Sequence, residues 1–236
     1  MKEQLQKDFD NTIKNLSLSQ KDIEIKKFSL DNFINKGFPN RKEEDWKFSD
    51  LNQIINKNIG ELSFYNDYTS TNKVDTSVFV DGLEHNKIVF INGRIEKIDF
   101  DYEKKGQIEI IDQSETINKF DNNNSLSDLN NAFTNKCFKI VIKTGYQLLK
   151  PLIIYHTTNS KIWSKNINLR LDFELQDDSC LRLIDLFNDT SEKNFLNIFY
   201  NFNLKEDAIL KNYKVDKLEN KNIKYSFNNI VQNKNT

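Results

Sequence analysis

The chain has 236 residues, and its 34 basic and 35 acidic side chains leave a net charge of −1. This balance gives no electrostatic reason to expect nucleic acid or a membrane surface as a partner. No run approaches the roughly 18 apolar residues that a membrane-spanning helix needs, and residues 1–8 lack the apolar core of a secretion signal. With only two cysteines, the sequence is typical of a cytoplasmic protein.

Two amphipathic helices are predicted at the N-terminus. The first has one apolar stripe at helical spacing, formed by Leu5, Phe9, Ile13 and Leu16. Ser17 and Ser19 can cap a second helix that runs to about Lys36, and its apolar side carries Ile23, Leu30, Phe33 and Ile34. Gly37 ends it, because glycine tolerates the left-handed conformation at a helix C-terminus. Both stripes are narrow, so these helices must lie on the protein body or on a partner.

Residues 37–51, GFPNRKEEDWKFSDL, separate the helices from the rest of the chain. Pro39 biases Phe38 towards extended backbone. Trp46 and Phe48 alternate, and we predict that the two rings are buried together and clamp the helical arm to the β body. The charged run over residues 41–45 fits either a docking site or a self-satisfied cluster of surface ion pairs.

The middle of the chain predicts short elements. Ser49 can cap a short helix carrying Leu51, Ile54 and Ile55, and residues 56–75 are expected to be loop. Residues 87–91 and 94–98 flank an Asn-Gly pair, which favours the type I′ turn of a β-hairpin. Residues 107–111 predict another strand, and residues 125–133 a capped helical turn.

A repeated pattern follows Phe138. Phe173, Leu175, Asp178 and Leu181 recur as Phe202, Leu204, Asp207 and Leu210 at one offset of 29 residues, which Ile167, Leu169 and Leu171 keep with Leu196, Ile198 and Tyr200. A fainter copy places Ile140 and Leu152 ahead of Leu169 and Leu181 by the same offset. A fourth copy is expected to begin near Tyr225 and Phe227.

Such a period indicates stacked repeats that bury their apolar faces on one another. A β-solenoid fits, and an antiparallel β-sandwich fits the period nearly as well. The small residues after the turns, Ser179 and Ala208, favour the solenoid, because the corners of stacked turns have little room. We therefore predict a mainly β chain: a helical segment with linker over 1–58, a mixed hairpin and loop region over 59–134, and a β-helix body over 135–236.

The stretch over residues 37–51 resembles a segment of the SufD family, scaffold proteins of the SUF iron–sulfur cluster assembly system. The family pattern is Gly-Phe/Leu-Pro-Thr-Arg-Lys-x-Glu-x-Trp-Lys/Arg-Tyr-Thr-x-Leu, and Asn40, Phe48 and Ser49 replace its Thr, Tyr and Thr. Residues 129–133, LNNAF, resemble a second family segment, Leu-Asn-x-Ala-Phe. A strand beginning at Pro151 and ending at His156 is similar to a third.

The resemblance implies a right-handed β-helix behind N-terminal helices and a scaffold in place of an enzyme. It also implies a SufBCD complex with a SufB-like scaffold subunit and a SufC-like ABC-type ATPase, in which the complex handles the iron–sulfur cluster. SufD-like proteins normally continue through more β-helix into a C-terminal helical region that holds their best-known functional residues. This chain is therefore expected to correspond to their N-terminal portion, and no such residue is carried over.

Candidate chemistry is sparse. Cys180 aligns with Ile209 of the next repeat, which indicates a packing position. Cys137 has no second cysteine or histidine near it in sequence, so no metal site is assigned. His156 is interpreted as a hydrogen-bonded residue at a strand end, and His85 as a solvated residue of a polar turn.

No catalytic or cofactor-binding motif is present in the sequence. The alternative to a SUF scaffold is a β-solenoid that binds carbohydrate or acts in surface interactions. Such proteins usually carry a secretion signal, which residues 1–8 do not indicate.

Overall fold

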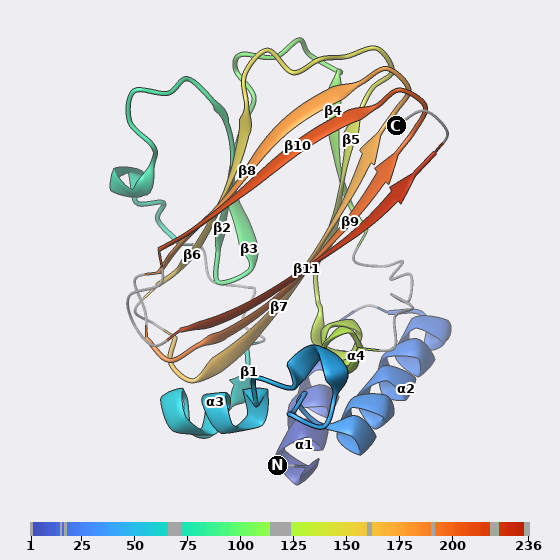
Figure 1. Cartoon of the computed structure of the whole chain (residues 1–236), viewed down its shortest axis with the longest axis vertical. Coiled ribbons are helices and arrows are strands. Elements are labelled where there is room, and N and C mark those ends of the chain that lie inside the picture. Colours follow the sequence, from blue (N-terminus) through green and yellow to red (C-terminus); the bar gives the residue numbers. More distant parts are fainter. Residues whose placement is uncertain are drawn as a thin grey trace.

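The computed structural model describes residues 2–14, 16, 18–65, 72–113, 124–159, 162–189, 192–217 and 222–233. Its strands form a β-solenoid of about three turns, with helices packed against one side (Figure 1). The expectation of a mainly β chain with N-terminal helices is confirmed. The sandwich alternative is excluded, because successive turns stack as parallel strands. The predicted cap Ser17 lies outside the described residues, as do residues 66–71 of the predicted loop.

Two sheets form the walls of the solenoid. Sheet A has the order β11 (Ile223–Gln232), β9 (Phe195–Leu204), β7 (Lys165–Leu175), β5 (Cys137–Ile142) and β4 (Ile108–Asp112), with the short β1 (Ser63–Phe64) also paired to β7. Sheet B has the order β10 (Ile209–Lys217), β8 (Cys180–Asp189), β6 (Leu152–Thr158), β2 (Asn86–Ile91) and β3 (Arg94–Asp99). The strands β3 and β4 run antiparallel to their neighbours.

The predicted offset of 29 residues is confirmed for the later turns, where Phe173 pairs with Phe202 and Leu181 with Leu210. It is wrong for the first turn, where Ile140 pairs with Phe173 and Leu152 pairs with Leu183. Two longer connections are the cause: the chain takes two residues more from Ile142 to Leu152 than between their partners Leu175 and Leu183, and two residues more from Thr158 to Asn166 than between Asp189 and Phe195. The two observed offsets differ from 29 by an even number of residues, and side chains alternate along a strand, so the same residues still point inwards.

The fourth copy is also displaced. Leu196 pairs with Lys224 in place of the expected Tyr225. The connection from β10 to β11 is one residue shorter than the connection from β8 to β9. Because side chains alternate along a strand, this slip turns Lys224 inwards and places Tyr225 and Phe227 on the outer face, against the helices.

Apolar side chains fill the space between the sheets, including Ile88, Phe90, Ile154, Leu169, Phe173, Leu183, Phe187, Ile198 and Phe202. The last described turn departs from this composition. In the middle of its strands the inward positions, set by the strand register, are Asn212, Lys214 and Asp216 on β10 and Lys224, Ser226 and Asn228 on β11, whereas Leu210 and Ile230 continue the apolar rows of Leu181 and Phe202. Lys214 Nζ donates to Ser226 Oγ and, at 3.0 Å, to Asn228 Oδ1.

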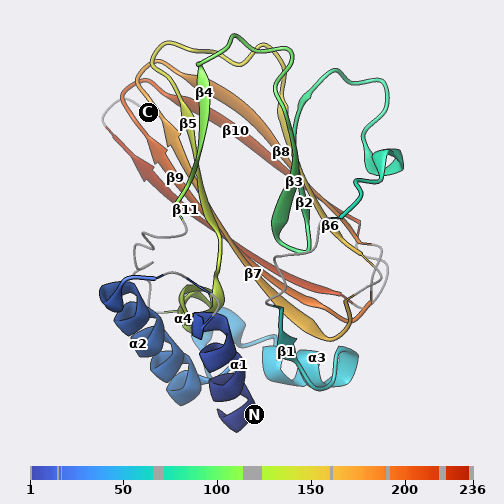
Figure 2. The same cartoon turned by 180° about the vertical axis from the view of Figure 1, so that it is seen from behind.

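The described helices lie on the outer side of sheet A, towards one end of its strands (Figure 2): α1 (Lys2–Lys14), α2 (Gln20–Lys36), α3 (Leu51–Asn58) and α4 (Ser125–Phe133). Of these, α4 packs on β7 and β9, and α2 packs on α4. As predicted, Ser19 caps α2, and Gly37 ends it with a φ of 74°. The cap of α3 is Asp50, whose side chain accepts a hydrogen bond from Gln53 N. The prediction of Ser49 as this cap is therefore wrong by one residue. No described helix is both long and apolar enough to span a membrane.

A buried lysine joins α2 to the end of α4. Lys26 Nζ donates to the carbonyl oxygens of Asn131, Ala132 and Thr134 at 3.2, 3.3 and 2.6 Å. Carbonyls at the end of a helix have no partner within the helix, so the lysine supplies one. Burial lowers the pKa of Lys26 to about 7, against the opposing charge of Asp22.

The predicted clamp is half correct. Trp46 lies against Tyr225 of β11, with ring centroids 6.0 Å apart, whereas Phe48 is 87% exposed. The rings do not share a face, because a 3-10 helix, η1 (Glu44–Trp46), replaces the expected extended chain. Of these two rings, only Trp46 packs against sheet A.

The predicted hairpin is confirmed as β2 and β3, and β2 also pairs with β6 within sheet B. Asn92 and Gly93 have φ values of 52° and 79°, as a type I′ turn requires. A Cβ atom on Gly93 would lie 2.8 Å from Ile167 Cγ2. The turn thus packs closely against sheet A, and glycine is needed there for both its φ and its size.

Candidate functional site

The most unusual group of side chains lies inside the solenoid, where the core is otherwise apolar. His156 on β6, Asp185 on β8, Tyr200 on β9 and Lys224 on β11 form what we call the buried network. His156 Nε2 lies 2.9 Å from Asp185 Oδ1 and 2.8 Å from Tyr200 Oη. Lys224 Nζ lies 3.6 Å from Asp185 Oδ2. The network therefore connects both sheets and successive turns.

Aromatic rings and a second acid complete the surroundings. The His156 ring stacks on Phe90, with centroids 5.4 Å apart and an angle of 13°. Lys224 Nζ lies 5.5 Å from the centre of the Phe187 ring and 2.6 Å from Asp216 Oδ1. Lys224 thus bridges a fully buried carboxylate and a more exposed one.

The protonation states follow from this geometry. Burial alone would raise the pKa of Asp185, but the adjacent His156 and Lys224 hold it well below its usual range. Burial and the Asp185 charge raise the pKa of Tyr200 well above its usual value. At neutral pH the centre of the network is therefore a carboxylate with a neutral phenol beside it.

The network has little free space around it. A cavity of about 10 Å³ adjoins His156, lined also by Phe90, Gly93, Leu169 and Ile198. A cavity of this volume holds one water molecule at most. The arrangement is therefore suited to fixing the last turns relative to one another by buried charge pairing.

Of the four members of this network, only His156 stands out in the sequence as a candidate for polar chemistry. His156 is hydrogen-bonded, as interpreted, although β6 continues past it to Thr158. Asp185 was missed, but a signal existed, because it interrupts the inward-facing row that Leu181, Leu183 and Phe187 otherwise keep apolar. Lys224 could not be placed, because its inward orientation depends on the shortened corner before β11.

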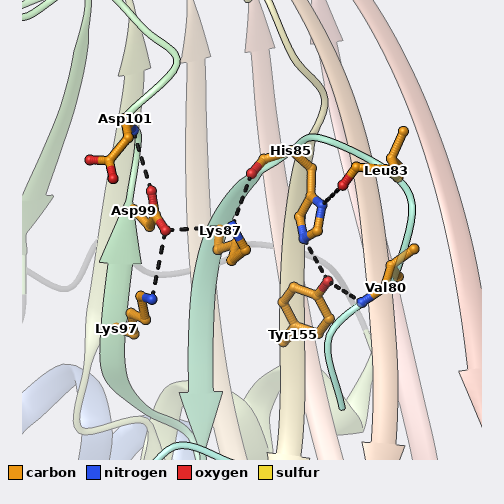
Figure 3. A network of polar contacts seen from close by, with 8 residues as sticks. All are labelled: Val80, Leu83, His85, Lys87, Lys97, Asp99, Asp101 and Tyr155. Carbon is orange, nitrogen blue, oxygen red and sulfur yellow. Dashed lines mark hydrogen bonds and ion pairs between the residues drawn. The ribbon is translucent and has the colours of Figure 1, made fainter. Parts of the chain in front are cut away.

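His85 is buried, which corrects the expectation of a solvated residue (Figure 3). Its Nδ1 lies 2.6 Å from Leu83 O, and its Nε2 lies 2.7 Å from Tyr155 Oη. Tyr155 Oη also accepts a hydrogen bond from Val80 N at 3.0 Å. Burial lowers the pKa of His85, which favours the neutral ring.

These contacts secure residues 72–85, which we call the strap, to the outer face of sheet B. The strap carries a short 3-10 helix, η2 (Thr76–Val78). Its apolar side chains pack on Val89, Ile91, Ile153, Tyr155 and Leu186. Nearby, Asp99 accepts from Lys87 at 3.4 Å and pairs with Lys97 at 3.6 Å (Figure 3). The histidine is therefore part of the attachment of the strap.

The cysteines lie in ordinary packing surroundings. Cys137 is buried, and burial together with Asp172, whose Oδ2 lies 3.9 Å from Sγ, raises the pKa of its thiol to about 12. Cys180 pairs with Ile209 in the sheet, as the alignment of repeats predicted, and is half-buried. Across the described ranges, no three His, Cys, Asp or Glu side chains are grouped to hold a metal ion.

The charged run over residues 41–45 is exposed along its whole length. An ion pair of 3.0 Å joins Glu44 to Lys47 on this surface. The run is thus accessible to a partner, and its proposed docking role stays a prediction.

Comparison of the chain with protein-family models and with curated proteins finds no match.

Proposed function

We propose that this chain is a scaffold subunit of a SUF-type iron–sulfur cluster assembly complex. In this proposal it works with a SufB-like scaffold subunit and a SufC-like ABC-type ATPase, and the complex as a whole assembles and transfers the cluster. One observation carries the proposal: the two sequence segments that resemble the SufD family meet in a single packed cluster.

This cluster joins the helices to sheet A. Phe38 of the first segment lies 6.0 Å from Phe195 of β9, ring centre to ring centre, at an angle of 78°. Leu129 and Phe133 of the second segment are buried in the same cluster, with Trp46 packed at its edge. Segments about ninety residues apart in sequence thus build one junction between the helices and the solenoid.

The junction accounts for both segments in structural terms. Aromatic side chains supply large buried area with defined edge-to-face geometry, which suits a fixed attachment of helices to a sheet. A SufD-like protein needs the same attachment, since its N-terminal helices precede a β-helix body. The resemblance therefore concerns the architecture of a scaffold.

The proposal is tested by depleting the protein in its source cells and assaying aconitase, a dehydratase that needs an iron–sulfur cluster. We expect aconitase activity to fall several-fold at unchanged polypeptide level and to return when iron and sulfide are supplied to the extract. Malate dehydrogenase, which holds no cluster, serves as the control. Unchanged aconitase activity in depleted cells would overturn the proposal.

A further inference from the structure

The outer face of sheet B is covered over only part of its width. The strap crosses β2 and β6 and places Val74, Phe79 and Val80 on the apolar side chains there. Farther along the sheet, Tyr213 and Val215 of β10 are 59% and 42% exposed. The views show the strap on the side of β2 and β6, away from β10 (Figures 1 and 2).

The exposed positions continue an apolar row that the strap begins to cover. In the register of the sheet, Tyr213 pairs with Ile184 and Val215 with Leu186. Leu186 and Ile184 already pack in the cluster beneath the strap. Side chains at these four positions share one face, which we call the β10 face.

The charged side chains at the outward positions of β8 and β10 have one sign. On β10 the outward positions before and after the apolar pair are Lys211 and Lys217. In the strand register, Lys211 lies next to Arg182 of β8. Arg182 also donates to the carbonyl oxygens of Leu148 and Leu149. No outward position of β8 or β10, as the structure describes them, carries a carboxylate.

The strap shows which chemistry this side of the sheet accepts. Its sequence from residue 74 to 84, VDTSVFVDGLE, combines apolar residues with three acids. Glu84 pairs with Lys150 at 2.5 Å. The Phe79 ring lies 6.0 Å from Lys87 Nζ and 5.8 Å from Lys97 Nζ. An apolar and acidic segment is thus held on an apolar surface with cations at its margin.

We propose that the β10 face binds a partner's peptide segment of the same kind, with apolar anchors flanked by carboxylates. The anchors cover Tyr213, Val215 and Ile184, and the carboxylates lie beside Lys211 and Lys217. The site is separate from the junction and the buried network, and it does not depend on a role in iron–sulfur assembly.

The test uses a fluorescein-labelled peptide, VDTSVFVDGLE, and fluorescence anisotropy with the whole chain. We expect saturable binding that weakens at least threefold between 50 and 300 mM salt, since exposed charge pairs are screened. Tyr213→Ser and Val215→Ser should each weaken binding at least fivefold, and Lys211→Gln with Lys217→Gln should abolish the salt dependence. Phe48→Ser, at an exposed ring far from the β10 face in sequence, is the matched control and should bind as wild type.

Absence of binding at millimolar protein would overturn the proposal. Binding that Tyr213→Ser and Val215→Ser leave unchanged would also overturn it, because the peptide would then be displacing the strap or pairing with a strand edge. A peptide with serine in place of Val74, Phe79 and Val80 should not bind. Equal binding by this peptide would also overturn the proposal, because the interaction would then be non-specific attraction between charges. Circular dichroism of each variant establishes that it is folded.

Discussion

Asp185 and Lys224 approach to 3.6 Å inside the solenoid, although one lies in sheet B and the other in sheet A. Their contact depends on the short connection before β11, which turns Lys224 inwards opposite Leu196. Both side chains are almost completely buried. The last described turn therefore has buried charge pairing in addition to apolar packing.

Replacing Lys224 with Met should lower the free energy of unfolding by about 3 kcal/mol, because it leaves buried Asp185 with one cationic neighbour fewer. Urea denaturation measures this. Lys211→Met, at an outward position of β10, is the control and should change stability by less than about 0.5 kcal/mol. If both variants unfold at the wild-type midpoint, the buried pair does not stabilise the fold.

The buried carboxylate should make stability depend on acid. The pKa of Asp185 is held well below its usual range in the folded chain, so the unfolded state binds a proton first as pH falls. Its contribution is complete above about pH 4 and is lost progressively below it. Denaturation midpoints from pH 7 to pH 3 should fall more steeply for the wild type than for Asp185→Asn. Midpoints that fall equally with pH in the two proteins would contradict this prediction.

Lys26 should give a pH dependence of the same sign in a higher pH range. Its pKa is lowered to about 7 from 10.5 by burial, so between these values the unfolded chain binds more protons than the folded one. Stability should therefore rise as pH increases from about 7 to 10. Lys26→Met removes the titrating group, and its midpoint should rise less over that range. An equal rise in the two proteins would show that the lysine keeps an ordinary pKa.

The linker offers a matched pair of aromatic substitutions. Trp46→Ala should destabilise the chain by about 1–3 kcal/mol, less than for a fully buried tryptophan, because the ring is only partly covered and contacts Tyr225. Phe48→Ala should have almost no effect, since that ring is 87% exposed. Thermal unfolding compares the two. A larger loss for Phe48→Ala would reverse the assignment.

Two glycines separate backbone strain from steric overlap. Gly93 and Gly106 have φ values of 79° and 82°, but only at Gly93 would a Cβ atom meet a neighbour, Ile167 Cγ2 at 2.8 Å. Alanine at either position has the cost of the positive φ, roughly 1 kcal/mol. Gly93→Ala should cost about 1–3 kcal/mol more. If chemical denaturation shows equal losses of stability for Gly93→Ala and Gly106→Ala, the turn does not pack closely against sheet A.

The pairing of residues between successive turns can be predicted from the sequence wherever the corners have equal length. Phe173 and Phe202 pair as their spacing predicts, because the corners over 176–179 and 205–208 match. Corner length itself is not encoded in the apolar alternation, so the register of Ile140 could not be obtained in this way. A single missing residue then reversed the expected orientation of Tyr225.

The candidate site was less predictable for a related reason. The network is assembled from four strands, and only the three-dimensional stacking brings Asp185 and Tyr200 to His156. His85 was misjudged because its partner, Tyr155, lies seventy residues away on a strand that the strap crosses. Local sequence described a polar turn, and the tertiary contact decided its burial.

Affinity capture of the tagged chain from its source cells, followed by quantitative mass spectrometry, tests the proposed scaffold role most directly. The account predicts that an ABC-type ATPase and a second β-solenoid scaffold protein are enriched together. The tagged Phe48→Ala chain should capture the same partners. Recovery of the folded chain with neither protein above the level of an untagged control would contradict the account.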